Sequence, residues 1–88
     1  MKTRINMVLV EISPGHPESY YVEIEEKPVG FLRLRHGHFR AEYREEVVYC
    51  AETKGDGTFD ASERQTEIEA ALRAIGLAHH KYMAYTRN

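Results

Sequence analysis

Histidine is the first residue type in this chain whose frequency suggests chemistry. The 88 residues include five histidines, and four of them form two close pairs, His36 with His38 and His79 with His80. A zinc site needs three or four His, Cys or carboxylate ligands that converge on one point. The chain has one cysteine and lacks both a CxxC and an HExxH spacing. We therefore predict turn and surface histidines, with no metal or other cofactor.

A second pattern resembles the spacing of a calcium-binding loop. From Asp56 to Glu67, oxygen-bearing side chains alternate as in an EF-hand, but Ala61 stands where that loop needs glycine for its sharp turn. Asp60 followed three residues later by Glu63 has the spacing of a helix capping box. We predict a tight turn and a helix start here, and no calcium site.

Nucleophilic side chains lack the setting that catalysis needs. Ser13 and Ser62 fall in a predicted turn and a predicted helix start, outside any nucleophile motif. Cys50 lies in the apolar run Val47–Ala51, so we predict a buried thiol that packs as a small hydrophobic residue. The sequence favours a non-enzymatic protein and predicts no catalytic residue.

The arginines gather in one part of the chain. Residues 31–44 hold four arginines and one glutamate, a balance of +3, whereas the whole chain has a net charge of −2 and the remainder therefore carries −5. Such asymmetry favours an acidic partner or a polyanion at this part of the surface.

The segment Gly30–Arg44 predicts a β-hairpin with a two-residue turn at residues 36 and 37. In this register Leu34 lies opposite Phe39 on an apolar face, and Arg33 lies opposite Arg40 on the other face. We call the second face the arginine face and predict that it binds the partner through Phe31, Arg33, Arg35, His38, Arg40 and Arg44.

Three further segments favour strands. Arg4–Ile12 is a nearly continuous apolar run, which predicts a strand buried on both sides, central in the sheet or beneath a helix. After a turn at residues 13–18, Tyr20–Glu26 alternates and buries one side. Glu46–Thr53 is the third strand.

The pairing of the Tyr20–Glu26 strand bears on the arginine face. With a turn at Lys27–Val29, Ile24 would lie opposite Leu32, and Glu23 would meet Arg33. Glu23 and Glu25 would then neutralise part of the positive charge. The arginine face is therefore either a binding surface or a solvated, self-compensated one.

Helical periodicity is clearest from Asp60 to Ile75. Apolar residues recur there at i, i+3, i+4 and i+7, namely Ile68, Ala71, Leu72 and Ile75. Gly76 has the position of a C-terminal cap, after which Leu77 would fold back onto the helix. Residues 78–86 fit a last strand or a short second helix, and we predict the strand.

Together these elements predict one α+β domain, residues 1–88, with an antiparallel meander-like sheet of four to six strands and one helix at about 60–75 packed on one face. The hairpin Gly30–Tyr43 with the later helix is similar in layout to certain plant and integrase arm-type DNA-binding domains. This similarity covers about half of the chain without a diagnostic motif, and we assign no family.

We expect a small binding or accessory module that uses the arginine face for a protein partner or self-association, because the chain is acidic overall and Tyr and Arg suit interfaces. Nucleic acid is the alternative, since arginine contacts phosphate and aromatic rings stack on bases. We expect a cytoplasmic protein without a membrane partner, because the chain has one cysteine and neither a signal segment nor a membrane span.

Overall fold

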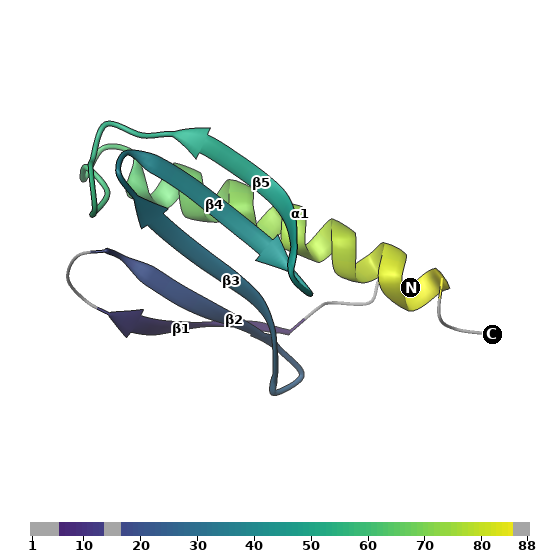
Figure 1. The fold of residues 1–88 in the computed structure, drawn as a ribbon. Helices are drawn as coiled ribbons and strands as arrows, with labels where there is room; N and C mark the ends of the chain where they lie inside the picture. Colours follow the sequence, from purple (N-terminus) through teal and green to yellow (C-terminus); the bar gives the residue numbers. More distant parts are fainter. Residues whose placement is uncertain (1–5, 14–16, 86–88) are drawn as a thin grey trace.

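The computed structural model describes residues 6–13 and 17–85 (Figure 1). Five strands form one antiparallel sheet in chain order, followed by one helix in the described residues. The elements are β1 (Met7–Ser13), β2 (Ser19–Ile24), β3 (Lys27–Arg35), β4 (His38–Tyr43), β5 (Glu46–Glu52) and α1 (Arg64–Tyr85). The predicted α+β meander with a C-terminal helix is confirmed. Part of the predicted turn at 13–18 and the start of the first predicted strand at Arg4 lie outside the described residues.

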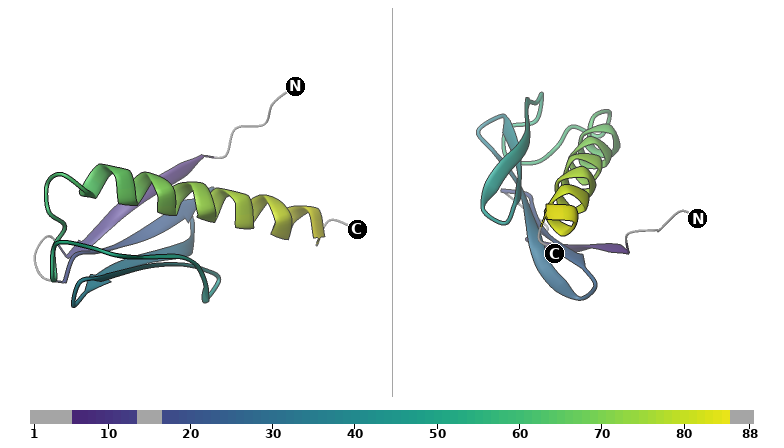
Figure 2. Two further views of the ribbon diagram at one scale, coloured as in Figure 1. Left: turned by 90° about the horizontal axis from the view of Figure 1, so that it is seen from above. Right: turned by 90° about the vertical axis from the view of Figure 1, so that its right-hand side faces the viewer.

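The sheet curves around the helix, as the right-hand view of Figure 2 shows. One side of the sheet packs on α1, chiefly through β4 and β5, and the other side is open. Alternation along the strands sorts side chains between these two sides. The largest fully buried side chains are Phe39, Leu32, Leu34, Ile75 and Val22.

The helix buries the stripe that its periodicity predicted. Ala71 and Ile75 are fully buried, while Ile68 and Leu72 pack against the core and remain partly exposed. Phe59, in the loop before α1, adds an edge-on contact with Phe39 at a centroid distance of 4.9 Å. The core thus lies between α1 and the inner side of the sheet.

The β3–β4 hairpin has the predicted register at every pair. Arg35 lies opposite His38, and the pairing continues without a bulge to Gly30 opposite Tyr43. The turn residues, His36 and Gly37, both have positive φ, 55° and 73°, which is the type I′ pattern that suits the twist of two paired strands.

The predicted pairing of β2 with β3 is wrong. Tyr20, not Ile24, lies opposite Leu32, because the chain turns at Glu25 and Glu26 instead of at residues 27–29. Glu23 consequently lies opposite Pro28. The expected cross-strand pair between Glu23 and Arg33 does not form.

β1 is an edge strand, which corrects the prediction of a strand buried on both faces, central in the sheet or beneath a helix; Met7 alone among its apolar residues packs against the core. β1 pairs with β2 and with no other described strand. Val8 is 48% exposed and Ile12 is 44% exposed. The apolar run indicates burial of both faces, but within residues 6–13 and 17–85 no element covers the exposed apolar side chains of β1.

α1 continues to Tyr85, so the predicted last strand at 78–86 is wrong as far as the structure describes it. Gly76 lies inside the helix and not at its cap. Glycine costs about 1 kcal/mol in a helix interior, but here it permits a close approach, since a Cβ at this position would lie 3.3 Å from the Cε of Met7. Leu77 does not fold back and is 66% exposed. The last turns of α1 extend beyond the sheet (Figure 1).

The start of the helix shows half of the predicted capping box. The Glu63 carboxylate accepts a hydrogen bond from the Asp60 N–H at 3.0 Å, while the Asp60 carboxylate accepts from the Ser62 N–H at 3.1 Å. Glu63 also accepts from the N–H groups of Lys54 and Gly55, and these bonds lower its pKa. The predicted tight turn is therefore fastened to the helix start.

Candidate binding face

The arginine face lies on the open side of the sheet. Along β3 and β4 its side chains alternate with the buried residues Leu32, Leu34 and Phe39, so they point away from α1. Five of the six predicted site residues come together here: Phe31, Arg33, Arg35, His38 and Arg40.

Two arginines face each other across this hairpin. Arg33 lies directly opposite Arg40, and like charges in that position destabilise a sheet. Arg40 is relieved in part by Glu42, whose Oε2 lies 3.4 Å from its Nε. Among residues 6–13 and 17–85, no carboxylate oxygen lies within 4.0 Å of Arg33 or Arg35. The repulsion is therefore only partly compensated within the described chain.

The turn end of the hairpin forms a shallow hollow of about 400 Å³. Its lining is entirely basic or imidazole in character: Arg33, Arg35, His36, His38 and Arg40. One carboxylate lies nearby, since Glu52 Oε2 is 2.9 Å from His38 Nδ1, but the Glu52 side chain is 86% exposed. Such a lining suits a carboxylate or phosphate group of a ligand.

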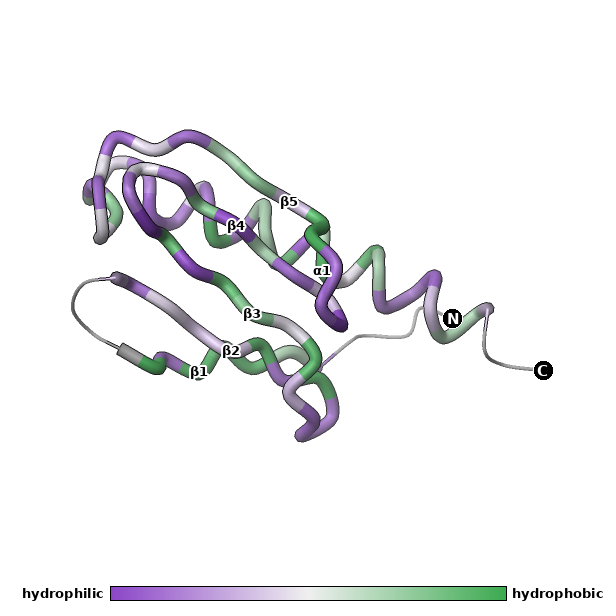
Figure 3. Tube along the Cα trace, in the orientation of Figure 1, coloured by the Kyte–Doolittle hydropathy of each residue, from purple (hydrophilic) through white to green (hydrophobic). Residues whose placement is uncertain are grey.

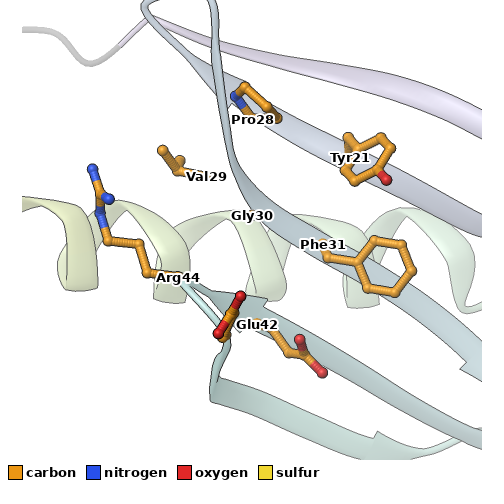
Figure 4. Close-up of a pocket in the computed structure, with 8 residues that line it drawn as sticks. Tyr21, Pro28, Val29, Gly30, Phe31, Glu42 and Arg44 are labelled. Atoms are coloured by element: carbon orange, nitrogen blue, oxygen red, sulfur yellow. The ribbon is translucent and has the colours of Figure 1, made fainter.

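An aromatic pair adjoins the arginines. Tyr21 from β2 and Phe31 from β3 lie opposite each other, with ring centroids 5.6 Å apart. The Arg33 guanidinium lies 5.9 Å from the Phe31 ring centroid. Figure 4 shows the two rings side by side at a hollow of about 480 Å³, with Glu42 at its border.

Tyr21 is a member of this surface that the sequence analysis did not include. It is 46% exposed, and its outward direction follows from the alternation of β2. The register error in the β2–β3 hairpin placed Tyr21 opposite Arg35 and so separated it from Phe31. A register with the turn at Glu25-Glu26 places the two rings opposite each other.

Arg44 lies apart from the other arginines, at the border of the hollow that Tyr21 and Phe31 line. It occupies the β4–β5 turn with φ of 49°, which breaks the alternation that would have pointed it outward. Its guanidinium carbon lies 4.0 Å from the Tyr82 ring centroid on α1, and its Nε donates to the Tyr43 hydroxyl at 3.2 Å. That hydrogen bond raises the pKa of Arg44. Arg44 thus fastens the turn to the helix; in Figure 4 its side chain extends away from Phe31.

Cys50 is exposed, which corrects the predicted burial of its thiol. It lies opposite Arg40 on the open side of the sheet. The surrounding run of apolar residues suggested burial, but in β5 alternate residues point outward, and the one helix of the described residues packs on the other side of the sheet. The thiol is therefore part of the surface next to the arginine face.

Glu18 forms a buried polar centre that sequence patterns did not reveal. Its side chain is 3% exposed and accepts hydrogen bonds from Arg64, Tyr20 and the Phe59 N–H. Burial alone would raise the pKa of Glu18, but these hydrogen bonds outweigh burial and lower it. Burial and the bond to Glu18 raise the pKa of Tyr20 to about 12. Fully satisfied in this way, Glu18 has a structural role.

The part of the chain that the structure describes contains no group of three His, Cys, Asp or Glu side chains placed to hold a metal ion. Nor does any helix there have the length and apolar character needed to cross a bilayer. Comparison with known proteins gives no match to a family model, a curated protein or a solved structure.

Proposed function

We propose that this protein is a small non-enzymatic binding module, and that its arginine face, with Tyr21 added and Arg44 removed, docks an acidic segment of a partner protein. The observation that carries the proposal is the opposed pair Arg33 and Arg40 on an open sheet side. The fold tolerates their repulsion although no carboxylate of the described residues pairs with Arg33. An acidic partner would supply the missing charge.

The composition of the surface fits a protein partner. Exposed aromatic rings beside arginines are typical of the residues that dominate protein interfaces. Tyr21 and Phe31 offer apolar area, and Arg33 and Arg35 offer bidentate donors for carboxylates. Self-association of two arginine faces is less favourable, because it would bring the arginines of both copies together.

Nucleic acid is the second candidate, and one observation favours it. The Tyr21–Phe31 pair lies directly beside the Arg33 guanidinium, an arrangement that can stack a base and contact the adjoining phosphate. Glu42 and Glu52 on the same side of the sheet and the net charge of −2 weigh against it. The single cysteine suits a reducing compartment, and we propose that the module acts in the cytoplasm.

Fluorescence anisotropy can test this proposal with two labelled probes, an Asp/Glu-rich peptide containing aromatic residues and a single-stranded oligonucleotide. We expect the wild-type protein to bind the peptide and Arg33→Glu/Arg40→Glu to lose that binding. A matched control is Arg73→Glu/Lys81→Glu, which makes the same charge change at exposed positions of α1. Equal peptide binding by both double variants would contradict the proposal. Preferential, steeply salt-dependent binding of the oligonucleotide would favour the second candidate.

A further inference from the structure

The sequence of β1 and its place in the fold disagree, and the disagreement is informative. Its apolar run, Met7–Val10, is typical of a strand whose two faces are both covered. In the structure β1 forms the lower edge of the sheet in Figure 1, with no described element beyond it. Figure 3 shows that this edge is largely hydrophobic. Four of its residues are large, apolar and exposed: Val8, Leu9, Val10 and Ile12.

This edge has little protection against pairing. Native edge strands are commonly interrupted by lysine, proline, an inward-pointing charge or an early bulge. From Met7 to Val10, β1 has none of these; Glu11, opposite the buried Tyr20, is the one inward charge, and the one irregularity comes after it. The opposite edge differs, because β5 begins and ends with glutamate and contacts α1. The β1 edge is therefore more accessible to a further strand than the β5 edge.

We propose that β1 pairs antiparallel with β1 of a second copy of this chain, about a two-fold axis that passes through Val10. In this register all seven residues of β1 are paired, from Met7 opposite Ser13 to Val10 opposite itself. Val8 lies opposite Ile12, so exposed apolar side chains meet across the interface. The strand then has a hydrogen-bonded neighbour at each of its two edges, and part of its exposed apolar surface is covered.

The pattern of β1 favours a second copy over a foreign strand. Glu11 is the one charged residue of the strand, and the register centred on Val10 places it opposite Leu9. A register centred on Glu11 would place the two carboxylates together, which destabilises a sheet. The strand is thus complementary to itself in the register that also pairs its full length.

The dimer has a consequence for the open side of the sheet. A two-fold axis perpendicular to the sheet keeps both copies of α1 on one side and both arginine faces on the other. The inference does not rest on the proposed function, because strand pairing uses the backbone edge of β1 and not the arginines. Val10 lies opposite Tyr21, so the two surfaces adjoin, but Arg33→Glu/Arg40→Glu leaves β1 unchanged and should still dimerise.

Sedimentation equilibrium over a range of concentrations tests the dimer directly. We expect the wild-type protein to reach twice its chain mass of 10.2 kDa. Val10→Lys should remain monomeric, since two lysines would meet at the axis. Val47→Lys is the matched control, because Val47 is 52% exposed on the opposite edge, and this variant should still dimerise. A wild-type monomer up to its solubility limit, or a dimer unaffected by Val10→Lys, would overturn the inference.

Cross-linking tests the register. With Cys50 replaced by serine, Val10→Cys should form a disulfide-linked dimer under mild oxidation, because residues directly opposite have Cα atoms about 4.5–5.5 Å apart. Val47→Cys in the same background should stay largely unlinked. Retained circular dichroism spectra show that both variants fold. Equal cross-linking of the two variants would overturn the proposed pairing.

Discussion

Arg64 donates two hydrogen bonds to Glu18, from Nε to Oε2 at 2.9 Å and from Nη2 to Oε1 at 3.0 Å. The first residue of α1 is thereby tied to the residue that precedes β2. The same carboxylate accepts from the Phe59 N–H at 3.0 Å, so one buried side chain joins the sheet, the loop and the helix.

Loss of this ion pair should destabilise the fold. We expect Arg64→Ala to lower the free energy of unfolding by about 2–4 kcal/mol, because it strips a buried carboxylate of its charged partner. The value is below that of a fully buried pair, since the Arg64 side chain is 45% exposed. Glu52→Ala, which breaks the exposed contact with His38, should change the free energy of unfolding by less than about 0.5 kcal/mol. Urea denaturation of both variants measures the difference; equal losses would contradict the role of Glu18.

The Glu18 carboxylate should make the free energy of unfolding depend on pH. Its pKa in the folded protein is lowered below the ordinary value of 4.5, so the folded state favours the ionised form. The resulting stabilisation is complete above the pKa of the unfolded chain and is lost as the pH falls through the folded pKa. We therefore expect the stability advantage of the wild type over Glu18→Gln to stay constant from neutral pH to about 5 and to shrink at lower pH. An advantage that persists unchanged into strong acid would contradict this assignment.

The helix stripe can be tested by truncation. Ile75 is fully buried and Leu77 is 66% exposed, so we expect Ile75→Ala to cost about 2–5 kcal/mol and Leu77→Ala less than about 0.5 kcal/mol. Leu72→Ala should cost less than Ile75→Ala because Leu72 is only partly buried. Thermal and urea denaturation provide the values. Similar costs at positions 75 and 77 would mean that the buried side of α1 is wrongly assigned.

The sequence predicted those elements whose local chemistry agrees with their place in the fold. The Gly30–Tyr43 hairpin has a glycine in its turn and alternates cleanly, and its register was correct at each pair. The β2–β3 and β4–β5 hairpins turn at Glu25-Glu26 and Arg44-Glu45. Neither pair contains the glycine or asparagine that normally marks such a turn, and both the β2–β3 register and the position of Arg44 were missed in consequence.

Long-range effects account for the remaining differences. Gly76 has the sequence position of a helix cap. Its observed role, a close contact with Met7, joins residues far apart in the sequence and could not be predicted locally. The ion pair of Glu18 with Arg64 spans 46 positions, and no local pattern indicates it. The outward direction of the five residues of the arginine face could be predicted from strand alternation alone. The position of Tyr21 beside Phe31 depends in addition on how β2 pairs with β3.

Cys50 offers a direct check on the outward side of β5. Because the thiol is exposed, we expect a maleimide reagent to label the native protein as completely as the unfolded protein. Ala41→Cys in a Cys50→Ser background is the matched control, since Ala41 is fully buried on the neighbouring strand. Mass spectrometry should show that this variant reacts only after unfolding. Protection of native Cys50 would contradict its exposure.

The turn between β2 and β3 holds conformational strain that substitution should release. Glu25 and Glu26 have φ of 53° and 69°, in the left-handed region that disfavours residues with a Cβ. We expect Glu25→Asn/Glu26→Gly to raise the free energy of unfolding by about 1 kcal/mol, because asparagine and glycine adopt this turn at lower cost. Urea denaturation measures the gain.

Charge offers a competing explanation, since the two carboxylates adjoin each other in the turn. Glu25→Ala/Glu26→Ala removes both charges but keeps the Cβ atoms that the left-handed conformation disfavours, so it should bring no gain. If the alanine variant gained as much stability as the Asn-Gly variant, repulsion between the glutamates and not backbone strain would be the cause. A gain confined to Asn-Gly would show that the pairing of β2 with β3, and with it the contact between Tyr21 and Phe31, is maintained against the local preference of the turn.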